Sequence, residues 1–187
     1  MTNPYEKCPV YENETYLLRL LAPSDAPDLF SVYSDEKAVP LFNSDNCIGG
    51  FHFTSLEQTQ TAIKFWLQSY ERKEFVRWSI VDKKIEKAVG TIELFNRRAE
   101  DYFNNCGLLR LDLRSDYERA ESIFEILSLI TPAIPELFEC RMIATKVPPF
   151  ASERKLAVER LGFAASEEKL VGGHDGKKYS DYYVFLA

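Results

Sequence analysis

Apolar and polar positions along the chain follow two periods, one typical of strands and one typical of helices. Segments rich in apolar and β-favouring residues predict strands at 15–21, 75–82, 88–95, 106–114, 141–147, 163–170 and 178–186. Apolar residues spaced by three and four predict helices that begin at Asp25, after Thr54, at 118 and after Ser152. A polar turn joins the strands 75–82 and 88–95, and a glycine-rich turn joins the last two strands, so each of these pairs is predicted to form a hairpin.

Residues typical of helix ends accompany the predicted helices. Ser24 and Ser152 are expected to cap the helices that follow them, and Thr54 with Glu57 forms the pattern of a capping box. Gly162 is expected to end the last helix in a left-handed conformation, which glycine adopts without steric penalty. These signals predict where the helices begin and end.

The order of the elements predicts the architecture. Two helices separate the first strand from a run of three strands, and helix and strand then alternate up to a final hairpin. A parallel sheet would need helices between nearly all strands. We therefore expect a mixed α/β (α+β) domain with a mostly antiparallel sheet and helices on both faces. Residues 1–14 are expected to form a loose N-terminal arm and residues 15–187 a single domain.

Composition and charge limit the kinds of partner that we expect for this protein. The 187 residues are 45% hydrophobic and carry a formal net charge of −6, which argues against nucleic-acid binding and weakly favours cationic substrates. The four cysteines form no CxxC pair and there are only two histidines, so no zinc site is expected. The first residues have no apolar core like that of a signal peptide, and no apolar run is long enough for a membrane helix. We expect a cytoplasmic protein without a membrane or metal partner.

Three local patterns resemble the GNAT superfamily of N-acetyltransferases. The segment LLRLLAPSDAPDL (17–29) is similar to the opening of its ribosomal-protein N-acetyltransferase branch (RimJ/RimL-like). The stretches RWSIV (77–81) and AVGTI (88–92) resemble the central hairpin of that branch, and VERLGF (158–163) resembles its helix-ending motif. The match covers about residues 15–186. It implies a GNAT-like acyl-CoA N-acyltransferase fold, with acetyl-CoA as co-substrate and a primary amine as acceptor.

In this family the pyrophosphate of the coenzyme lies on a glycine-containing loop at a helix N-terminus, where free N–H groups and the helix dipole favour an anion. The matching loop here is RSDYERA (114–120), which contains no glycine. The resemblance implies coenzyme contacts along the preceding strand and this loop, from Leu111, Leu113, Arg114, Ser115, Tyr117, Arg119 and Ala120, and from Arg154 on the later helix. The same loop has a simpler interpretation, in which Asp116, Glu118 and Glu121 stabilise the helix N-terminus.

Two carboxylates are candidates for the base that takes the proton of the acceptor amine. Strand alternation places Glu93 on one face with Val89, Thr91 and Phe95, where it could face a substrate cleft. Asp112 lies on the strand expected to line the thioester. Arg110, Asp112 and Arg114 share a strand face, so an internal ion-pair ladder is the structural alternative for that group. The family's Asn and Ser positions before the last helix hold Ala151 and Arg154, so no general acid is assigned.

Two functions remain open at this point: an acetyl-CoA-dependent N-acyltransferase and a non-catalytic GNAT-like module that binds an acyl-CoA or a protein partner. A purely structural interaction domain is a third. A gap between strands 106–114 and 141–147, with free N–H groups at 115–120, would favour coenzyme binding. A cleft filled by Tyr117 or Phe150 would favour the non-catalytic module. Dimers are common among such enzymes, so a homodimer is an expectation without an identified interface.

Overall fold

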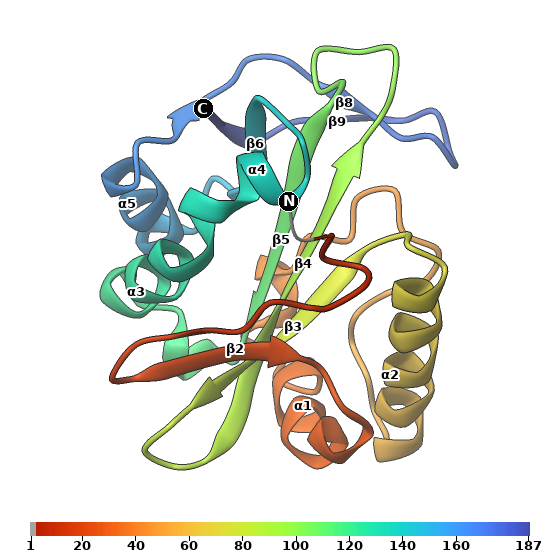
Figure 1. The fold of residues 1–187 in the computed structure, drawn as a ribbon, viewed down its shortest axis with the longest axis vertical. Helices are drawn as coiled ribbons and strands as arrows, with labels where there is room; N and C mark the ends of the chain where they lie inside the picture. Colours follow the sequence, from red (N-terminus) through yellow and green to blue (C-terminus); the bar gives the residue numbers. More distant parts are fainter. Residues whose placement is uncertain (1–2) are drawn as a thin grey trace.

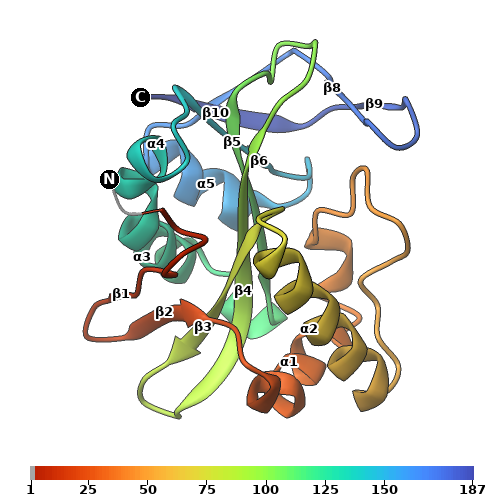
Figure 2. The same cartoon turned by 45° about the vertical axis from the view of Figure 1, so that its right-hand side comes forward.

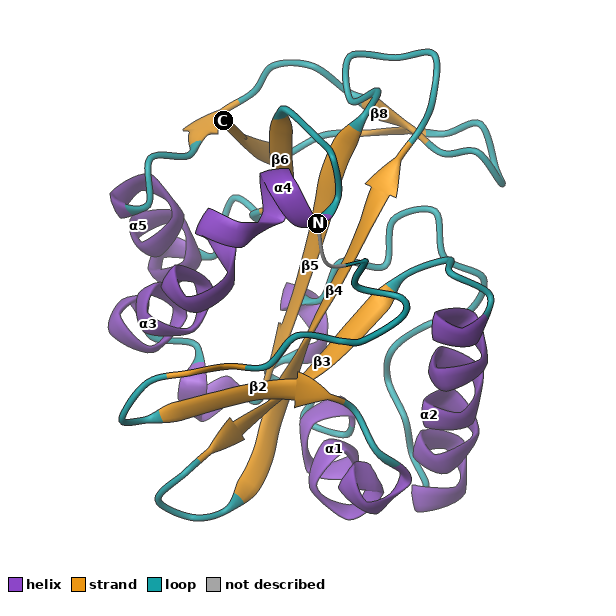
Figure 3. Ribbon diagram, in the orientation of Figure 1, coloured by secondary structure: helices purple, strands orange, loops and turns teal. Residues whose placement is uncertain are grey.

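The computed structural model describes residues 3–187 and is built around an eight-stranded sheet (Figures 1 and 3). The strands lie in the order β1-β2-β3-β4-β5-β6-β10-β7. Their bounds are β1 Tyr11–Glu12, β2 Tyr16–Leu20, β3 Val76–Asp82, β4 Lys87–Arg97, β5 Cys106–Leu113, β6 Met142–Lys146, β7 Ala164–Ala165 and β10 Tyr182–Leu186. Only β5 and β6 run parallel, and every other neighbouring pair in this sheet is antiparallel. The predicted mixed, mostly antiparallel sheet is therefore confirmed.

Helices cover both faces of the sheet (Figure 2). One face carries α1 (Ala26–Tyr33) and α2 (Leu56–Glu71), and the other carries α3 (Ala120–Ile130) and α5 (Ser152–Arg160). A short helix, α4 (Ile134–Leu137), follows α3. The two helical layers bury two apolar surfaces of the central strands, so the sheet is covered on both sides at its centre.

A β-bulge in β4 changes which way its side chains face. The β3–β4 register shifts between Ile80 and Val81, so Val89 is an extra residue on the β4 side. As a result Val89 joins the core on the α3 face, whereas Thr91 and Glu93 lie on the α1–α2 face. The predicted sharing of one face by Val89, Thr91 and Glu93 is wrong at Val89, because simple alternation does not continue through a bulge.

The observed helix caps differ from the predicted ones at three ends. Ser24 does not cap α1, whose N-cap is Asp25, and the carboxylate of Asp25 accepts hydrogen bonds from Arg19 and the Ala22 N–H. The cap of α2 is Ser55, one residue after the predicted Thr54, and its hydroxyl accepts from the Gln58 N–H. Ser152 is already the first helical residue of α5 and makes no cap.

The predicted C-terminal features are seen in modified form. Gly162 has a φ of +89°, as expected for a left-handed residue that ends α5. The glycine-rich turn does form a hairpin, between β8 (Leu170–Val171) and β9 (Lys178–Tyr179), but this hairpin is a separate two-stranded sheet. The longer strand β10 pairs instead with β6 and β7.

The N-terminal segment, expected to be a loose arm, lies against the domain from residue 3 onward. β1 pairs with β2, and the carbonyl of Pro9 accepts a hydrogen bond of 2.8 Å from the indole N–H of Trp78. The Tyr70 hydroxyl donates to the carbonyl of Pro4, and Tyr5 packs between Tyr70 and Phe138. Pro9 thus supplies the acceptor that a buried indole requires. Within residues 3–187, no helix combines the length and the apolar character needed to cross a membrane.

Candidate active site

The two parallel strands separate part-way along the sheet. β5 and β6 are paired from Cys106 with Met142 as far as Leu109 with Thr145, and β5 then continues to Leu113 without a strand on that side. The β5–β6 pairing therefore ends in the region where coenzyme binding would require a gap between strands 106–114 and 141–147.

Backbone groups of β5 face this gap. The N–H of Arg114 donates to the carbonyl of Val89 on β4, and the register pairs Asp112 with Thr91 in the same ladder. Because the hydrogen-bonding direction alternates from residue to residue, Leu111 and Leu113 direct their backbone groups away from β4 and toward the gap. The side chains of these two leucines lie in the core on the α3 face. The structure thus places two of the predicted coenzyme contacts at the gap through their main chain.

Most hydrogen-bonding groups of the loop after β5 are already bound to other groups of the protein. The guanidinium of Arg114 forms an ion pair of 2.6 Å with Asp116, and the Ser115 N–H donates to Asp35 at 2.8 Å. Burial opposes ionisation of Asp35, but hydrogen bonds from Ser115 and from nearby backbone groups lower its pKa overall. The N–H groups of residues 117, 118 and 119 donate to carbonyls within the loop.

One N–H group at the N-terminus of α3 is bound by a carboxylate of the protein itself. The Ala120 N–H donates to Glu153 on α5 at 2.7 Å, and Arg119 is the N-cap residue, without a side-chain cap bond. Arg154, the next residue on α5, forms a buried two-point ion pair with Glu118. Arg154 therefore lies beside the loop as predicted, but its guanidinium is already bound to a carboxylate.

The two side chains expected to fill the cleft in a non-catalytic module lie elsewhere. The Tyr117 hydroxyl donates to Asp82 at the end of β3, and its ring contacts Tyr16 edge-on. Phe150 is 65% exposed. The gap is therefore not blocked by these aromatic residues, whereas the N–H groups at the phosphate end are mostly occupied.

An open pocket of about 1420 Å³ lies on the other helical face, over β3, β4 and β5. Its wall contains residues of α2 and of the α1–α2 connection, and His174 from the β8–β9 hairpin lies at its edge. The aromatic lining residues are Phe51, Phe53, Phe65, Trp66, Phe75 and Phe95. Arg77, Glu93 and Arg110 are charged lining residues from the central strands, and Glu57, Arg72 and Glu74 are further charged residues of the lining.

These charged residues belong to a buried network. The carboxylate of Glu93 accepts from Arg77 through one oxygen and from Arg110, at 2.8 Å, through the other. Arg77 also donates to Asp112 at 3.2 Å, and the Tyr33 hydroxyl donates to the same oxygen of Asp112 at 2.9 Å. The sequence candidates Glu93 and Asp112 are thus linked through one guanidinium. Arg110 and Asp112 thus take part in internal ion pairs across β3, β4 and β5, as in the structural alternative for that group, whereas Arg114 pairs outside it with Asp116.

The two carboxylates differ in their affinity for a proton. Burial opposes ionisation of Glu93, but the guanidinium groups of Arg77 and Arg110 outweigh it and lower the pKa of Glu93. For Asp112, burial outweighs the attraction of Arg77 and the hydrogen bond from Tyr33, so its pKa is raised. Asp112 therefore accepts a proton more readily, while Glu93 is the one that lines the pocket.

Comparison with known proteins identifies the family. A model of the acetyltransferase (GNAT) domain matches residues 16–164. The chain belongs to this family. The prediction of a GNAT acetyltransferase is thereby confirmed at the level of the family and of its fold.

Individual relatives of this GNAT chain are distant. YoaA, an uncharacterized N-acetyltransferase of Bacillus subtilis (strain 168), is 26% identical over 97 residues, which are 49% of this chain and 51% of that protein. The match thus spans about half the length of this curated relative.

Two solved structures show the same fold. The ribosomal-protein-S5-alanine acetyltransferase of Vibrio fischeri has a TM-score of 0.70 at 16% identity, with 95% of this chain and 96% of that chain covered. RimL, a ribosomal L7/L12 alpha-N-protein acetyltransferase in complex with coenzyme A, has a TM-score of 0.70 at 15% identity, covering 95% and 98%.

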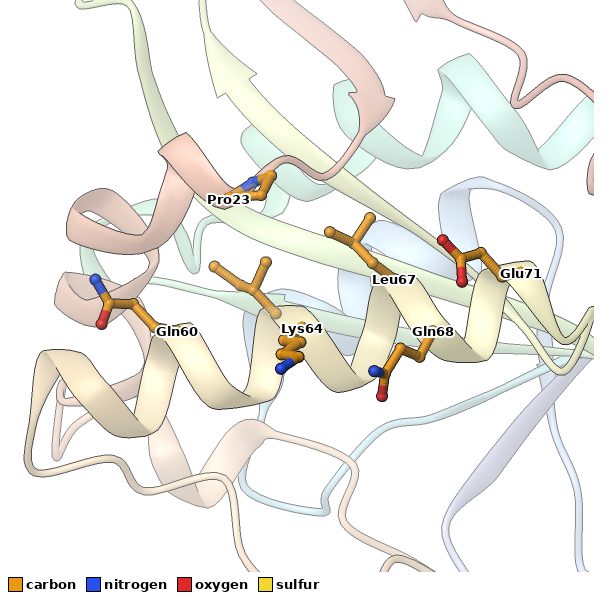
Figure 4. A pocket seen from close by; sticks show the side chains of 7 residues that line it. Pro23, Gln60, Lys64, Leu67, Gln68 and Glu71 are labelled. Carbon is orange, nitrogen blue, oxygen red and sulfur yellow. The ribbon is translucent and has the colours of Figure 1, made fainter.

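Other candidate features of the GNAT domain are weaker. Cys47 and His52 both line the large pocket, but burial raises the pKa of the Cys47 thiol, which disfavours the nucleophilic thiolate. A smaller pocket of about 520 Å³ lies between Pro23 and α2 (Figure 4). Gln60, Lys64, Gln68 and Glu71 line it from consecutive turns of that helix, and it contains none of the buried network. Within residues 3–187, no three His, Cys, Asp or Glu side chains meet in a group that could hold a metal ion.

Sequence reasoning missed three residues that shape this site. Arg77 lies within a strand that is buried on both faces, and an apolar strand with helices predicted on both sides of the sheet could have marked it as an inward-facing charge. Glu153 and Asp35 bind the N–H groups of the loop after β5 from distant segments. No local pattern indicates these two contacts, because they depend on how α5 and the end of α1 are placed in the fold.

Proposed function

We propose that this protein is an acyl-CoA-dependent N-acyltransferase that transfers an acetyl group from acetyl-CoA to a primary amine. The observation that carries the proposal is the separation of β5 from β6 after Leu109, which leaves the main chain of Leu111 and Leu113 facing a gap. A pantetheine arm with its own amide groups fits such an edge by adding hydrogen bonds like those of a strand. The coenzyme-bound RimL supports this arrangement through its shared fold.

In the proposed reaction the neutral amine nitrogen attacks the thioester carbonyl carbon. A C–N bond forms and the C–S bond breaks; the nitrogen loses one proton to a base, and the departing thiolate takes up one proton and leaves as the thiol of coenzyme A. The main-chain N–H groups at the gap would stabilise the negative charge that develops on the carbonyl oxygen. Holding both reactants in one ternary complex would supply much of the rate, because attack then occurs within a single complex.

The two carboxylates would have different roles. Glu93 lines the pocket but is bound by two guanidinium groups, and a carboxylate with a lowered pKa is a weak proton acceptor. We therefore propose that Glu93 positions Arg77 and Arg110. Asp112, with its raised pKa, is the better base, and the Tyr33 hydroxyl that donates to it would connect it to Thr91.

At the other end of the gap, the pyrophosphate would lie near Arg114 and the N-terminus of α3. Arg114 and Arg119 would provide positive charge. For the phosphates to bind here, Glu153 would have to release the Ala120 N–H. Glu118 would likewise have to release the Arg154 guanidinium. This requirement is the observation that favours the second candidate function, a non-catalytic GNAT module that binds a partner without the coenzyme.

Calorimetry with acetyl-CoA tests the proposal. Micromolar binding that is weakened about tenfold by Arg114→Ala would support it, since one charge-assisted contact to phosphate has about this magnitude. Arg98→Ala is the matched control, because Arg98 is exposed beyond the end of β4. Absence of binding to acetyl-CoA and to longer acyl-CoAs would reject the enzyme and leave the non-catalytic module. A panel of primary amines with acetyl-CoA would then establish turnover in a protein that binds.

A further inference from the structure

The large pocket has two arginine side chains at its floor, inside an aromatic wall. Arg77 and Arg110 both line the pocket, and both bind the same single carboxylate, Glu93. Asp112, the other partner of Arg77, is not among the lining residues. The charged groups at the floor are therefore two guanidiniums and one carboxylate, and the second counter-charge, Asp112, lies 3.2 Å from Arg77 behind the pocket surface.

Among the described residues, the other carboxylates near the pocket form no ion pair with the two floor arginines. Arg110 donates to the backbone carbonyl of Asp45, whose side chain is bound by Lys146 at 2.6 Å. At the rim, Glu74 is paired with Arg72. Glu57 lies exposed in the first turn of α2. Of the carboxylates in residues 3–187, Glu93 and Asp112 are the ones that form ion pairs with Arg77 and Arg110.

The two guanidinium groups also keep unused hydrogen-bonding capacity. Within residues 3–187, the Nε–H groups of Arg77 and Arg110 have no acceptor although both are buried. The Arg77 guanidinium lies 4.1 Å from the centre of the Trp66 ring, and that of Arg110 lies 5.6 Å from the centre of the Phe95 ring. Stacking on aromatic rings fixes the guanidinium planes and leaves their edges for a planar acceptor such as a carboxylate. Buried guanidinium donors favour an anion over a neutral or cationic group.

We propose that the acceptor amine carries a carboxylate on an aromatic body, as an aromatic α-amino acid does, and that Arg110 binds this carboxylate. This inference rests on the proposed function for the identity of the reacting group. The aromatic side chain of the substrate would pack against the ring of Phe51 or Phe75, and its carboxylate would accept hydrogen bonds from a floor guanidinium. A protein N-terminus has no carboxylate next to its amine, so the pocket favours a small molecule. A polyamine would bring positive charge to two arginines.

Matched ligand pairs test the proposal on the wild-type protein without any coenzyme. The binding of L-phenylalanine and L-tryptophan is measured by calorimetry against phenethylamine and tryptamine, which lack only the carboxylate. We expect the amino acids to bind at least about tenfold more tightly, as for one charge-assisted bidentate contact. Equal binding of the two members of a pair, tighter binding of the amines, or no binding of either would overturn the proposal.

Two variants assign the effect to Arg110. Arg110→Gln should remove the preference for the carboxylated ligand, and Arg110→Lys, which keeps the charge but not the planar fork, should retain part of it. Arg72→Gln, at the rim of the same pocket, should leave the preference unchanged. Circular dichroism shows whether each variant is folded, and the wild-type ligand pairs decide the question if Arg110→Gln is not. Loss of acetyl-CoA binding would reject the proposed function while leaving this ligand preference measurable by itself.

Discussion

Arg154 on α5 and Glu118, two residues before α3, form an ion pair in which both side chains are almost fully buried. The pair joins the first turn of α5 to the loop where the phosphates of a coenzyme would lie. Breaking a buried pair by removing one partner leaves an uncompensated charge, which is strongly unfavourable. A phosphate that replaces Glu118 as the partner of Arg154 avoids that penalty. The coenzyme and Glu118 would therefore compete for one guanidinium.

The neighbouring residue gives the simplest test of this competition. Glu153→Gln removes a negative charge from the N-terminus of α3 and weakens the hydrogen bond that residue 153 accepts from the Ala120 N–H. We expect acetyl-CoA to bind about fivefold more tightly to this variant in calorimetry, since a charge at a helix terminus contributes on this scale. Glu159→Gln on the same helix is the control, because the Glu159 side chain is exposed and its carboxylate pairs with Lys155 at 3.9 Å. Unchanged affinity in Glu153→Gln would place the pyrophosphate elsewhere.

A pH dependence follows from the lowered pKa of Glu93. An acid whose folded pKa is depressed stabilises the fold above its unfolded pKa of about 4.3, and this stability is lost as the pH falls through the folded value. Glu93→Gln should therefore lower the free energy of unfolding by about 3–5 kcal/mol at pH 7, because Arg77 and Arg110 lose their shared partner.

The measurement is urea unfolding at pH 7 and at several values below pH 5. The difference between wild type and Glu93→Gln should shrink as the pH falls below about 4.3. Exposed Glu100, replaced by Gln, serves as the control and should show little difference at any pH. If the difference for Glu93→Gln stayed constant down to the acid limit, packing and not charge would explain it.

The close approach of β4 and β5 at the bulge predicts an intolerant glycine. A Cβ on Gly90 would collide with the carbonyl oxygen of Asp112 and would lie 2.7 Å from a methyl carbon of Leu113. We expect Gly90→Ala to lower the free energy of unfolding by about 2 kcal/mol or more, as for an overpacked core. Gly173→Ala is the matched control, since no heavy atom lies within 4 Å of its added Cβ. Equal stability of the two variants in urea unfolding would show that β4 and β5 can separate without penalty.

The contacts of the N-terminal segment predict that it contributes to stability. Deleting residues 1–10 removes the hydrogen bonds to Trp78 and Tyr70 and the packing of Tyr5. We expect a loss of about 2 kcal/mol, which corresponds to a fall in the melting temperature of roughly 4–8 °C for a chain of this size. Thermal unfolding followed by circular dichroism measures it. An unchanged melting temperature would mean that the segment is the loose arm expected from sequence.

The main elements of this fold could be read from the sequence because they depend on local periodicity. The alternation in residues 75–82 and the apolar face of residues 120–130 each indicate one structure, and the tertiary fold agrees with both. The site was less predictable. Glu93 and Asp112 were recognised as candidates, but their pairing with Arg77 depends on strand register, which includes a bulge at Val89 that no local pattern announces. The contact of Glu153 with Ala120 joins segments 33 residues apart. A pattern within a short stretch of sequence therefore cannot predict it.

Because the β5–β6 pairing ends part-way, the backbone amides of β5 can report separately on the sheet and on the gap. Along β5, the amides of Arg110 and Asp112 point to β4, and those of Leu111 and Leu113 point to the gap. In hydrogen–deuterium exchange, the first pair should exchange only when β4 and β5 separate, whereas the second pair should exchange faster. A coenzyme in the gap would slow Leu111 and Leu113 and leave Arg110 and Asp112 unaltered. Residue-resolved exchange along four consecutive amides would thus show occupancy of the gap and stability of the sheet independently.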